Sequence, residues 1–219
     1  MPTTLVLVPT DLERRLLAPM LAGGLGAGER VEICGFGAVA AAARTAALVA
    51  AARPDRVLLV GIAGRLDAGL SIGAAYRFEK VACHGVGAGS GAAFVPAATL
   101  GWPQWPGDPA AADVAIGDVI ELSGSCGGFA PGGGLLLTAC AASASADDVA
   151  ARRATHPAAM AEDMEGFGVA LACRLLGVPL AIVRGISNEA GDREHARWQV
   201  PAALAAAADL AVRVLEESP

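Results

Sequence analysis

Apolar runs of strand length alternate with segments of helical periodicity in the first third of the chain. Runs at residues 5–8, 31–34 and 57–60 predict strands, because polar or glycine residues bound each of them. Thr10 and Glu13 have the spacing of a capping box at the start of a helix, and a long alanine-rich helix is predicted after the second run. This strand–helix–strand–helix–strand order is typical of a parallel sheet with crossover helices.

The rest of the chain continues the pattern less regularly. Further strands are predicted at residues 74–83, 118–122, 133–140 and 178–184, and further helices at 147–154, 167–176 and from Pro201 to 217. The Gly- and Pro-rich span 85–109 is predicted to be a surface loop. We find no internal repeat or domain boundary. The sequence therefore predicts a single three-layer α/β domain over residues 1–219, with a mostly parallel or mixed central sheet flanked by helices.

Composition narrows the class of protein. Apolar residues make up 54% of the chain and charged residues 17%, which predicts a buried sheet and a homo-oligomer, dimer or higher. The net charge of −6 argues against a nucleic-acid partner. Because no apolar run suits a membrane span and the start lacks a basic segment, a cytoplasmic protein with no membrane partner is expected. The scattered cysteines and histidines show no metal-ligand spacing.

A glycine-rich turn raises a dinucleotide-binding alternative. Gly35-Phe36-Gly37-Ala38-Val39-Ala40 fits G-x-G-x-x-[GA] between a predicted strand and a predicted helix. A dinucleotide-binding unit also needs an acidic residue at the end of the next strand, for the ribose hydroxyls. That strand ends in Val60-Gly61-Ile62-Ala63, and the nearby acid, Asp55, precedes it. A nicotinamide or flavin enzyme is therefore disfavoured, and no cofactor is expected.

Several motifs, in one order along the chain, resemble the nucleoside phosphorylase/nucleosidase superfamily. They are the Gly35–Ala42 turn, Pro54-Asp55-Arg56-Val57, Gly61-Ile62-Ala63-Gly64, Met164-Glu165-Gly166 and Ile186-Ser187-Asn188. The Asn at the end of the last motif, in place of Asp, resembles the futalosine hydrolase branch. The resemblance implies the fold of this superfamily and, for that branch, release of hypoxanthine from futalosine in menaquinone biosynthesis.

The resemblance implies roles for two glutamates. Glu13 matches the water-activating glutamate of nucleosidases; the alternative is a capping glutamate on a solvent-exposed face. Glu165 matches the glutamate that accepts hydrogen bonds from the ribose 2′- and 3′-hydroxyls, a task that suits two carboxylate oxygens. The alternative for Glu165 is an acidic residue at a helix N-terminus that interacts favourably with the helix dipole. Glu162 and Asp163 are expected to have that role. Met164 is expected to pack on the sugar, with a core position as the alternative.

Asn188 carries the prediction of the base. A 6-oxopurine presents acceptors at O6 and N7, and an Asn amide offers them a donor, whereas an ionised Asp offers acceptors alone. Asn188 is therefore expected to hold the departing base; the alternative is a turn residue after a strand. Further substrate contacts are expected at Ala63, Gly64, Ala142, Ser143, Ser187 and Arg193.

Two residues depart from the wider superfamily. Ile62 stands where many relatives have Ser or Thr, and Ala142 where the adenine-cleaving members have an aromatic residue. Phe94, Trp198 and Phe167 are left as candidates to stack on the base.

Futalosine also carries a benzoate, so the resemblance implies a cation near the site. Arg193, Arg77 and His195 are candidates, and Arg193 is in addition a candidate to orient the base.

The predicted reaction is hydrolysis of an N-glycosidic bond in a small nucleoside. One alternative is a purine nucleoside phosphorylase, which needs an anion site; the basic residue near Gly61-Ile62-Ala63 is Arg65, and Glu13 would repel phosphate. The other is a non-catalytic nucleoside-binding protein, against which the joint presence of Glu13, Glu165 and Asn188 argues.

Overall fold

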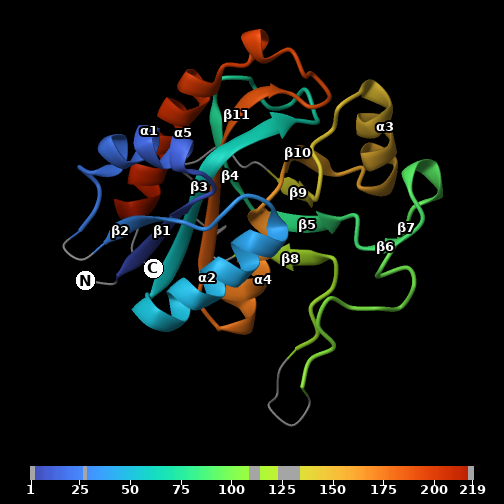
Figure 1. The fold of residues 1–219 in the computed structure, drawn as a ribbon, viewed down its shortest axis with the longest axis horizontal. Helices are drawn as coiled ribbons and strands as arrows, with labels where there is room; N and C mark the ends of the chain where they lie inside the picture. Colours follow the sequence, from blue (N-terminus) through green and yellow to red (C-terminus); the bar gives the residue numbers. More distant parts are fainter. Residues whose placement is uncertain (1–2, 27–28, 109–113, 123–133, 217–219) are drawn as a thin grey trace.

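Within the described part of the chain, nine strands form a mixed sheet at the centre of the molecule (Figure 1). The computed structural model describes residues 3–26, 29–108, 114–122 and 134–216. Its strands are β1 (Thr4–Val8), β2 (Arg30–Ile33), β3 (Arg56–Arg65), β4 (Ala75–Phe78), β5 (Lys80–His84), β6 (Gly87–Ala88), β7 (Val95–Pro96), β8 (Val119–Glu121), β9 (Leu135–Ala139), β10 (Ala159–Asp163) and β11 (Leu180–Glu189).

The strand order is β2-β1-β3-β10-β9-β5-β8, and β11 pairs with β3 and β4. β3 is long, with 10 residues, and it has several partners. Its first half lies parallel between β1 and β11, while its last residues, Gly64 and Arg65, pair antiparallel with β10. One strand therefore connects the two halves of the sheet, and its end contributes to both.

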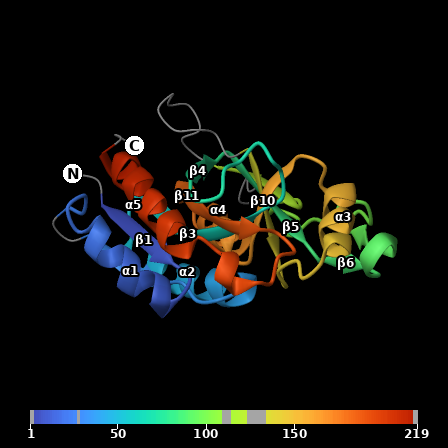
Figure 2. The same ribbon diagram turned by 90° about the horizontal axis from the view of Figure 1, so that it is seen from above.

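Helices cover both faces of the sheet. They are α1 (Asp11–Leu21), α2 (Ala38–Ala52), α3 (Ala146–Thr155), α4 (Gly166–Leu175) and α5 (Val200–Glu216), with 3₁₀ turns η1 (Gly91–Ala93) and η3 (His195–Arg197). Figures 1 and 2 show α1 beside α5 and α2 beside α4, while α3 lies at the opposite end of the sheet from α1. Among the described residues, no helix combines the length and apolarity needed to cross a bilayer.

The side-chain alternation of the central strands builds a core on each face. In β1, Leu5 and Leu7 pack into the cluster that includes residues of α2 and α4. Val6 and Val8 pack into the cluster that includes residues of α1 and α5. Because a strand's successive side chains point to opposite faces, a strand that is apolar throughout needs a helical layer on each side. The predicted α/β fold, a mixed sheet flanked by helices, is confirmed.

In the described part of residues 74–163, the structure differs from the predicted elements in three places. Residues 74–83 form two strands, because β4 pairs with β11 whereas β5 pairs with β9. The span 85–109 contains a short hairpin of β6 and β7. β10 was not predicted, since its sequence, Ala-Met-Ala-Glu-Asp, lacks the β-branched and aromatic residues that favour strands. Pairing with β3 and β9 holds it in place.

Candidate active site

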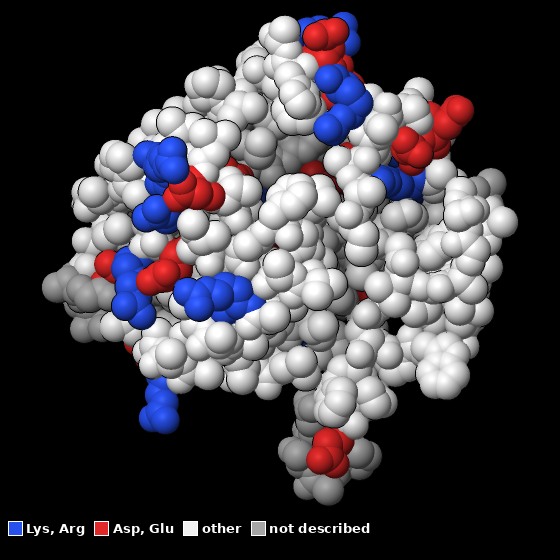
Figure 3. Space-filling model, in the orientation of Figure 1, with Lys and Arg blue, Asp and Glu red and all other residues white. Residues whose placement is uncertain are grey.

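A cavity of about 370 Å³ opens beside the ends of β1, β3, β10 and β11. The carboxyl ends of strands in α/β sheets are the usual location of ligand sites. In Figure 3 a hollow is visible on this face, with acidic atoms recessed in it and basic atoms on the loop above. The cavity is lined by the predicted catalytic and substrate-binding residues: Glu13, Ala63, Gly64, Ala142, Ser143, Met164, Glu165, Ser187, Asn188 and Arg193.

Glu13 caps its helix and also faces the cavity. Its backbone N–H donates to Thr10 Oγ1 at 3.2 Å, which is the predicted N-cap hydrogen bond. The carboxylate turns inward and is buried, accepting from Thr10 Oγ1 at 2.7 Å and from the backbone N–H of Ile62 at 3.2 Å. The cap and the cavity position are therefore compatible, because the side chain is held by both.

Arg184 is a fully buried cation in β11, beneath the cavity. Its Nε and Nη2 donate to Asp163 Oδ2 at 3.1 and 2.6 Å, and Nη2 lies 3.4 Å from Glu165 Oε2. Burial alone would lower the pKa of Arg184, but the charges of Asp163, Glu165 and Glu13 raise it above the usual value. Arg184 was not among the residues predicted to be functional, although an arginine in an otherwise apolar strand is a signal of such a role.

Asp163 is a buried structural carboxylate, so its predicted role as a helix-start acid was incomplete. Its Oδ1 accepts from Thr138 Oγ1 at 2.6 Å, and its Oδ2 accepts from the backbone N–H of Gly166 at 2.9 Å in addition to Arg184. Thr138 Oγ1 in turn accepts from the backbone N–H of Phe167 at 2.8 Å. These bonds join β9, β10, β11 and the first turn of α4.

One nitrogen of Arg184 packs against the backbone of Gly61, close to Glu13. Nη1 is buried and has no hydrogen-bond partner among the described residues. A Cβ on Gly61 would overlap Nη1 and would lie 2.7 Å from Glu13 Oε1, so only a glycine here lets the guanidinium and the carboxylate approach the same stretch of β3. An unpartnered donor and a carboxylate acceptor that lie this close could both hydrogen-bond one water molecule.

Glu165 lies next to this group, at the start of α4. Its Oε1 accepts from the backbone N–H of Gly37 at 3.0 Å. Burial raises the pKa of Glu165 to about 7, with Arg184 opposing the rise and Asp163 adding to it. Gly37, at φ 85°, belongs to the turn that resembles a dinucleotide fingerprint. Its N–H donates to a protein carboxylate, so this turn does not have the phosphate-binding role of a dinucleotide fingerprint.

Glu162 and Arg152 fix the loop between β9 and α3. Glu162 Oε1 accepts from the backbone N–H of Ser143 at 2.8 Å and Oε2 from Ser143 Oγ at 2.7 Å. Arg152 Nη1 forms a buried ion pair with Glu162, and its Nη2 donates to the Ala141 carbonyl at 2.5 Å. The simple helix-start role expected for Glu162 is wrong, because its carboxylate holds Ser143 at the cavity wall.

A β-bulge places Ser187 and Asn188 together. Ile186 pairs with Ala63 and Asn188 with Gly64, so Ser187 is the extra residue in β11. Both side chains line the cavity, and Ser187 Oγ donates to Asn188 Oδ1 at 2.7 Å. The amide Nδ2 donates to the Glu189 carbonyl at 2.8 Å. The pair therefore lies within β11, just before its last residue Glu189, whereas the sequence pattern predicted that it would follow the strand.

Of the aromatic candidates for base stacking, Trp198 lines the cavity. Phe167 is buried in the core cluster and Phe94 lies against the His84 ring, 5.0 Å between centroids. Phe36, which the sequence analysis did not consider, also lines the cavity. Of the candidate cations, Arg193 and His195 lie at the cavity, whereas Arg77 lies in β4 and pairs with Val183 of β11.

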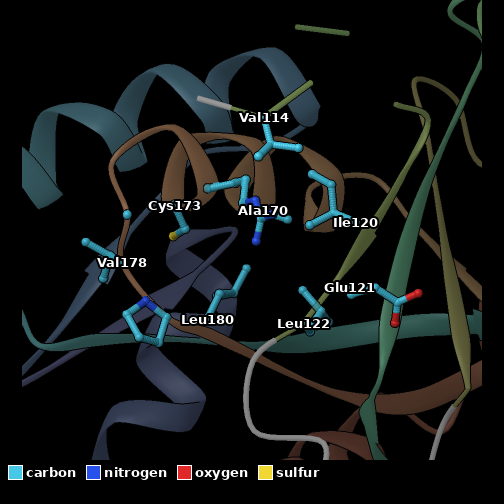
Figure 4. Close-up of a pocket in the computed structure, with 11 residues that line it drawn as sticks. Val114, Ile120, Glu121, Leu122, Ala170, Cys173, Val178 and Leu180 are labelled. Carbon is cyan, nitrogen blue, oxygen red and sulfur yellow. The ribbon is translucent and has the colours of Figure 1, made fainter. Parts of the chain in front are cut away.

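A second hollow, of about 330 Å³, lies between α4, β8 and the start of β11 (Figure 4). Figure 4 shows Cys173, Val178, Leu180 and Ile120 around it. Glu121, also in its lining, forms an ion pair with Lys80 at 2.8 Å. No residue predicted to touch substrate lines this hollow, so it is a poor candidate for the chemistry.

The profile of the phosphorylase superfamily matches residues 20–218, which is most of the chain. The chain belongs to this superfamily. The resemblance inferred from the sequence motifs is thereby confirmed.

Curated relatives include proteins of two names. The futalosine hydrolase of Thermus thermophilus is 34% identical over 233 residues, which cover 97% of this chain and 95% of that protein. The futalosine hydrolase of Streptomyces coelicolor is 34% identical over 155 residues, 71% of this chain and 63% of its own length. The 5′-methylthioadenosine/S-adenosylhomocysteine nucleosidase of Haemophilus influenzae is 31% identical over 156 residues, 70% of this chain and 65% of its own length.

Solved structures share the fold. The 5′-methylthioadenosine/S-adenosylhomocysteine nucleosidase of Neisseria meningitidis, in complex with methylthio-immucillin-A, aligns with a TM-score of 0.76 and 24% identity over 99% of each chain. The Colwellia psychrerythraea nucleosidase, in complex with adenine, aligns with a TM-score of 0.77 and 24% identity over 98% of this chain and 94% of that one.

The Arg152–Glu162 ion pair should contribute strongly to stability. Glu162→Gln leaves a buried arginine without its counter-charge, so the free energy of unfolding should fall by about 3 kcal/mol in a urea titration. The double variant Arg152→Met/Glu162→Leu leaves no isolated charge and should be more stable than Glu162→Gln. Full additivity of an Arg152→Met, Glu162→Leu double-mutant cycle would contradict direct coupling of the two side chains.

Proposed function

We propose that the protein is an N-glycosyl hydrolase that cleaves the bond between a purine base and ribose. The observation that carries this proposal is the approach, at Gly61, of a buried and unpartnered guanidinium nitrogen, Arg184 Nη1, to the carboxylate oxygen Glu13 Oε1. Glu165 adjoins it and lines the same cavity as Asn188. The names of the curated relatives, futalosine hydrolase and 5′-methylthioadenosine/S-adenosylhomocysteine nucleosidase, support the same reaction class.

In the proposed mechanism a water molecule attacks the anomeric carbon of the ribose. Arg184 Nη1 orients the water and Glu13 accepts its proton as the general base. The glycosidic C–N bond breaks through a sugar with oxocarbenium character, whose positive charge the surrounding carboxylates stabilise. Glu165 accepts hydrogen bonds from the 2′- and 3′-hydroxyls and fixes the sugar. The electron pair of the broken bond leaves with the base, which Asn188 holds through its amide.

Hydrolysis is favoured over phosphorolysis by the charge around the nucleophile position. Arg184 already has Asp163 and Glu165 beside its guanidinium, and Glu13 faces its remaining nitrogen. Arg65, the cation considered from the sequence, donates to Glu189 at 2.6 Å and to the Leu70 carbonyl at 3.0 Å. Phosphate would meet carboxylates at this position, whereas water meets a donor and an acceptor. Base release should therefore not depend on phosphate.

The finer proposal is futalosine as substrate, with hypoxanthine and dehypoxanthine futalosine as products in menaquinone biosynthesis. It rests on Asn188, whose amide suits O6 and N7 of a 6-oxopurine, and on the futalosine hydrolases among the relatives. The second candidate is cleavage of an adenine nucleoside, as the name of the Haemophilus influenzae relative suggests. Base release from futalosine, its 6-amino analogue, inosine and methylthioadenosine, each with and without phosphate, separates these candidates. Release from none would favour a nucleoside-binding protein.

Glu13→Gln should abolish most of the activity. The amide keeps the shape of the side chain but cannot accept the proton of the water, so kcat should fall about 10²-fold or more. Steady-state hydrolysis measures the rate, and calorimetry on the variant measures binding of the intact substrate, which should persist. Glu121→Gln, at the second hollow, is the matched control and should hydrolyse at the wild-type rate. Wild-type turnover by Glu13→Gln would leave Glu13 as a helix cap.

Asn188→Asp should change the preferred base. An ionised Asp offers acceptors to O6 and N7 of hypoxanthine, so futalosine cleavage should collapse near neutral pH, while the 6-amino analogue gains an acceptor for its amino group. The ratio of kcat/KM for the two substrates should shift toward the amino analogue by at least tenfold, about 1.4 kcal/mol. An unchanged ratio would show that Asn188 does not contact the base.

The activity should fall on the acid side of neutrality. Burial raises the pKa of Glu165 to about 7, so this carboxyl becomes protonated as the pH falls below that value. Protonation removes the charge that accepts both ribose hydroxyls, so kcat/KM should decrease with an apparent pKa of about 7. A 2′-deoxy substrate, which lacks one of these donors, should show a weaker acid limb. A profile that stays flat to about pH 5.5 would exclude this role for an ionised Glu165.

A further inference from the structure

The loop after β11 holds an arginine without a counter-ion at the mouth of the cavity. Arg193 is exposed and lines the cavity, and none of the described residues forms an ion pair with it. The adjacent Asp192 binds another residue: its carboxylate accepts from Arg197 Nε at 3.0 Å and Nη2 at 2.8 Å. The loop therefore leaves the charge of Arg193 available to a ligand.

Trp198 positions this arginine. The guanidinium carbon of Arg193 lies 5.3 Å from the centroid of the Trp198 ring, a cation–π contact. The ring itself is fixed, because Nε1 donates to the Asp192 carbonyl at 3.1 Å and His195 packs against it with 4.5 Å between centroids. This contact with a fixed ring leaves the guanidinium N–H groups of Arg193 free to bind an anion.

The acidic interior of the cavity limits where an anionic group can bind, and Arg193 lies outside that interior. Glu13, Glu162, Asp163 and Glu165 line the cavity, so an anionic group would be repelled from its interior. The buried cations are paired, Arg184 with Asp163 and Arg152 with Glu162. Among the described lining residues, Arg193 is the arginine that can bind an incoming anion, and it lies at the mouth.

The arrangement of the cavity indicates which end of a nucleoside would reach Arg193. Asn188 pairs with Gly64 across the two strands. Gly64 lies against Glu162, and Glu162 holds Ser143, which comes shortly before α3. The base is therefore on the α3 side. The loop begins at Gly191, which lies against Ser145 and Val149 at α3, and then runs to Trp198, two residues before α5. Figures 1 and 2 show α5 away from α3. With the ribose at Glu165 between them, the 5′ substituent points toward Trp198 and Arg193.

We propose that Arg193, positioned by Trp198, binds a carboxylate at the end of the substrate's 5′ substituent. This inference rests on the proposed nucleosidase function and adds a specificity-determining residue to it. The carboxylate accepts from the guanidinium edge, where an exposed charge pair strengthens binding without entering the acidic interior. A neutral 5′ substituent reaches the same place and gains nothing from the arginine.

The test compares futalosine with its methyl ester, which differs in the carboxylate alone. With the wild-type protein kcat/KM should favour the acid, and Arg193→Gln should reduce the acid-to-ester ratio about fivefold, the upper range for an exposed ion pair. The loss should be mainly in KM, since the group lies far from the reacting bond. The wild-type preference should also shrink as salt rises from about 0.05 to 0.5 M, whereas the variant's ratio should not change.

Two further variants isolate the effect. Arg174→Gln removes an exposed arginine at the second hollow, outside the loop of Arg193, and should leave the acid-to-ester ratio unchanged. Trp198→Leu should reduce the ratio without removing the charge, because the guanidinium loses its platform.

The outcomes separate this inference from the proposed function. Equal hydrolysis of acid and ester by the wild-type protein, or an unchanged ratio in Arg193→Gln, would overturn the role of Arg193 and leave nucleosidase activity intact. Absence of hypoxanthine release from both compounds would overturn the proposed function, and the inference that rests on it.

Discussion

The ion pair between Arg184 and Asp163 is the interaction on which the site depends. A guanidinium that is fully buried needs a counter-charge and several acceptors, because desolvation otherwise exceeds what any single contact returns. Asp163 supplies the charge and is itself held by Thr138 and the start of α4. Glu165 and Glu13 then lie close to a fixed positive centre, which allows carboxylates to cluster where their repulsion would otherwise separate them.

The buried ion pair constrains the backbone segments that surround it. β11 carries the arginine, β10 carries its partner, and β3 passes between them with a glycine at residue 61, where any side chain would meet the guanidinium. The turn before α2 donates an N–H to Glu165. Four separate segments of sequence therefore converge on one charge, and the cavity is the space they leave.

Much of the fold and of the site was predictable from sequence because the signals are local. Apolar runs between helical segments indicate a sheet with helices on both sides, and polar residues after those runs indicate the edge where a site forms. Glu13, Glu165 and Asn188 were therefore expected in one place, and they line one cavity. Their chemical roles stay predictions, as do the oligomer and the single-domain organisation.

The features that the sequence did not predict depend on tertiary contacts, which leave no local sequence pattern. The local sequence indicates only that Arg184 lies in a strand. Its role in the ion pair comes from burial against residues some twenty positions away along the chain. Glu162 reads as an acid at a helix start, yet it anchors Ser143 from another loop. β10 has weak strand propensity and exists because its neighbours pair with it.

The bulge in β11 separates the hydrogen bonds of Asn188 from the buried hydrogen-bond network of Arg184. Asn188 is bonded through its side chain to its sequence neighbours Ser187 and Glu189, whereas Arg184, four residues earlier, is tied to other strands. Under the proposed function, a change at the end of the strand would therefore alter which base is bound without disturbing the hydrogen bonds around Arg184. A single substitution at this bulge would then suffice to change base preference, whereas a change of the buried arginine would require changes in its acids as well.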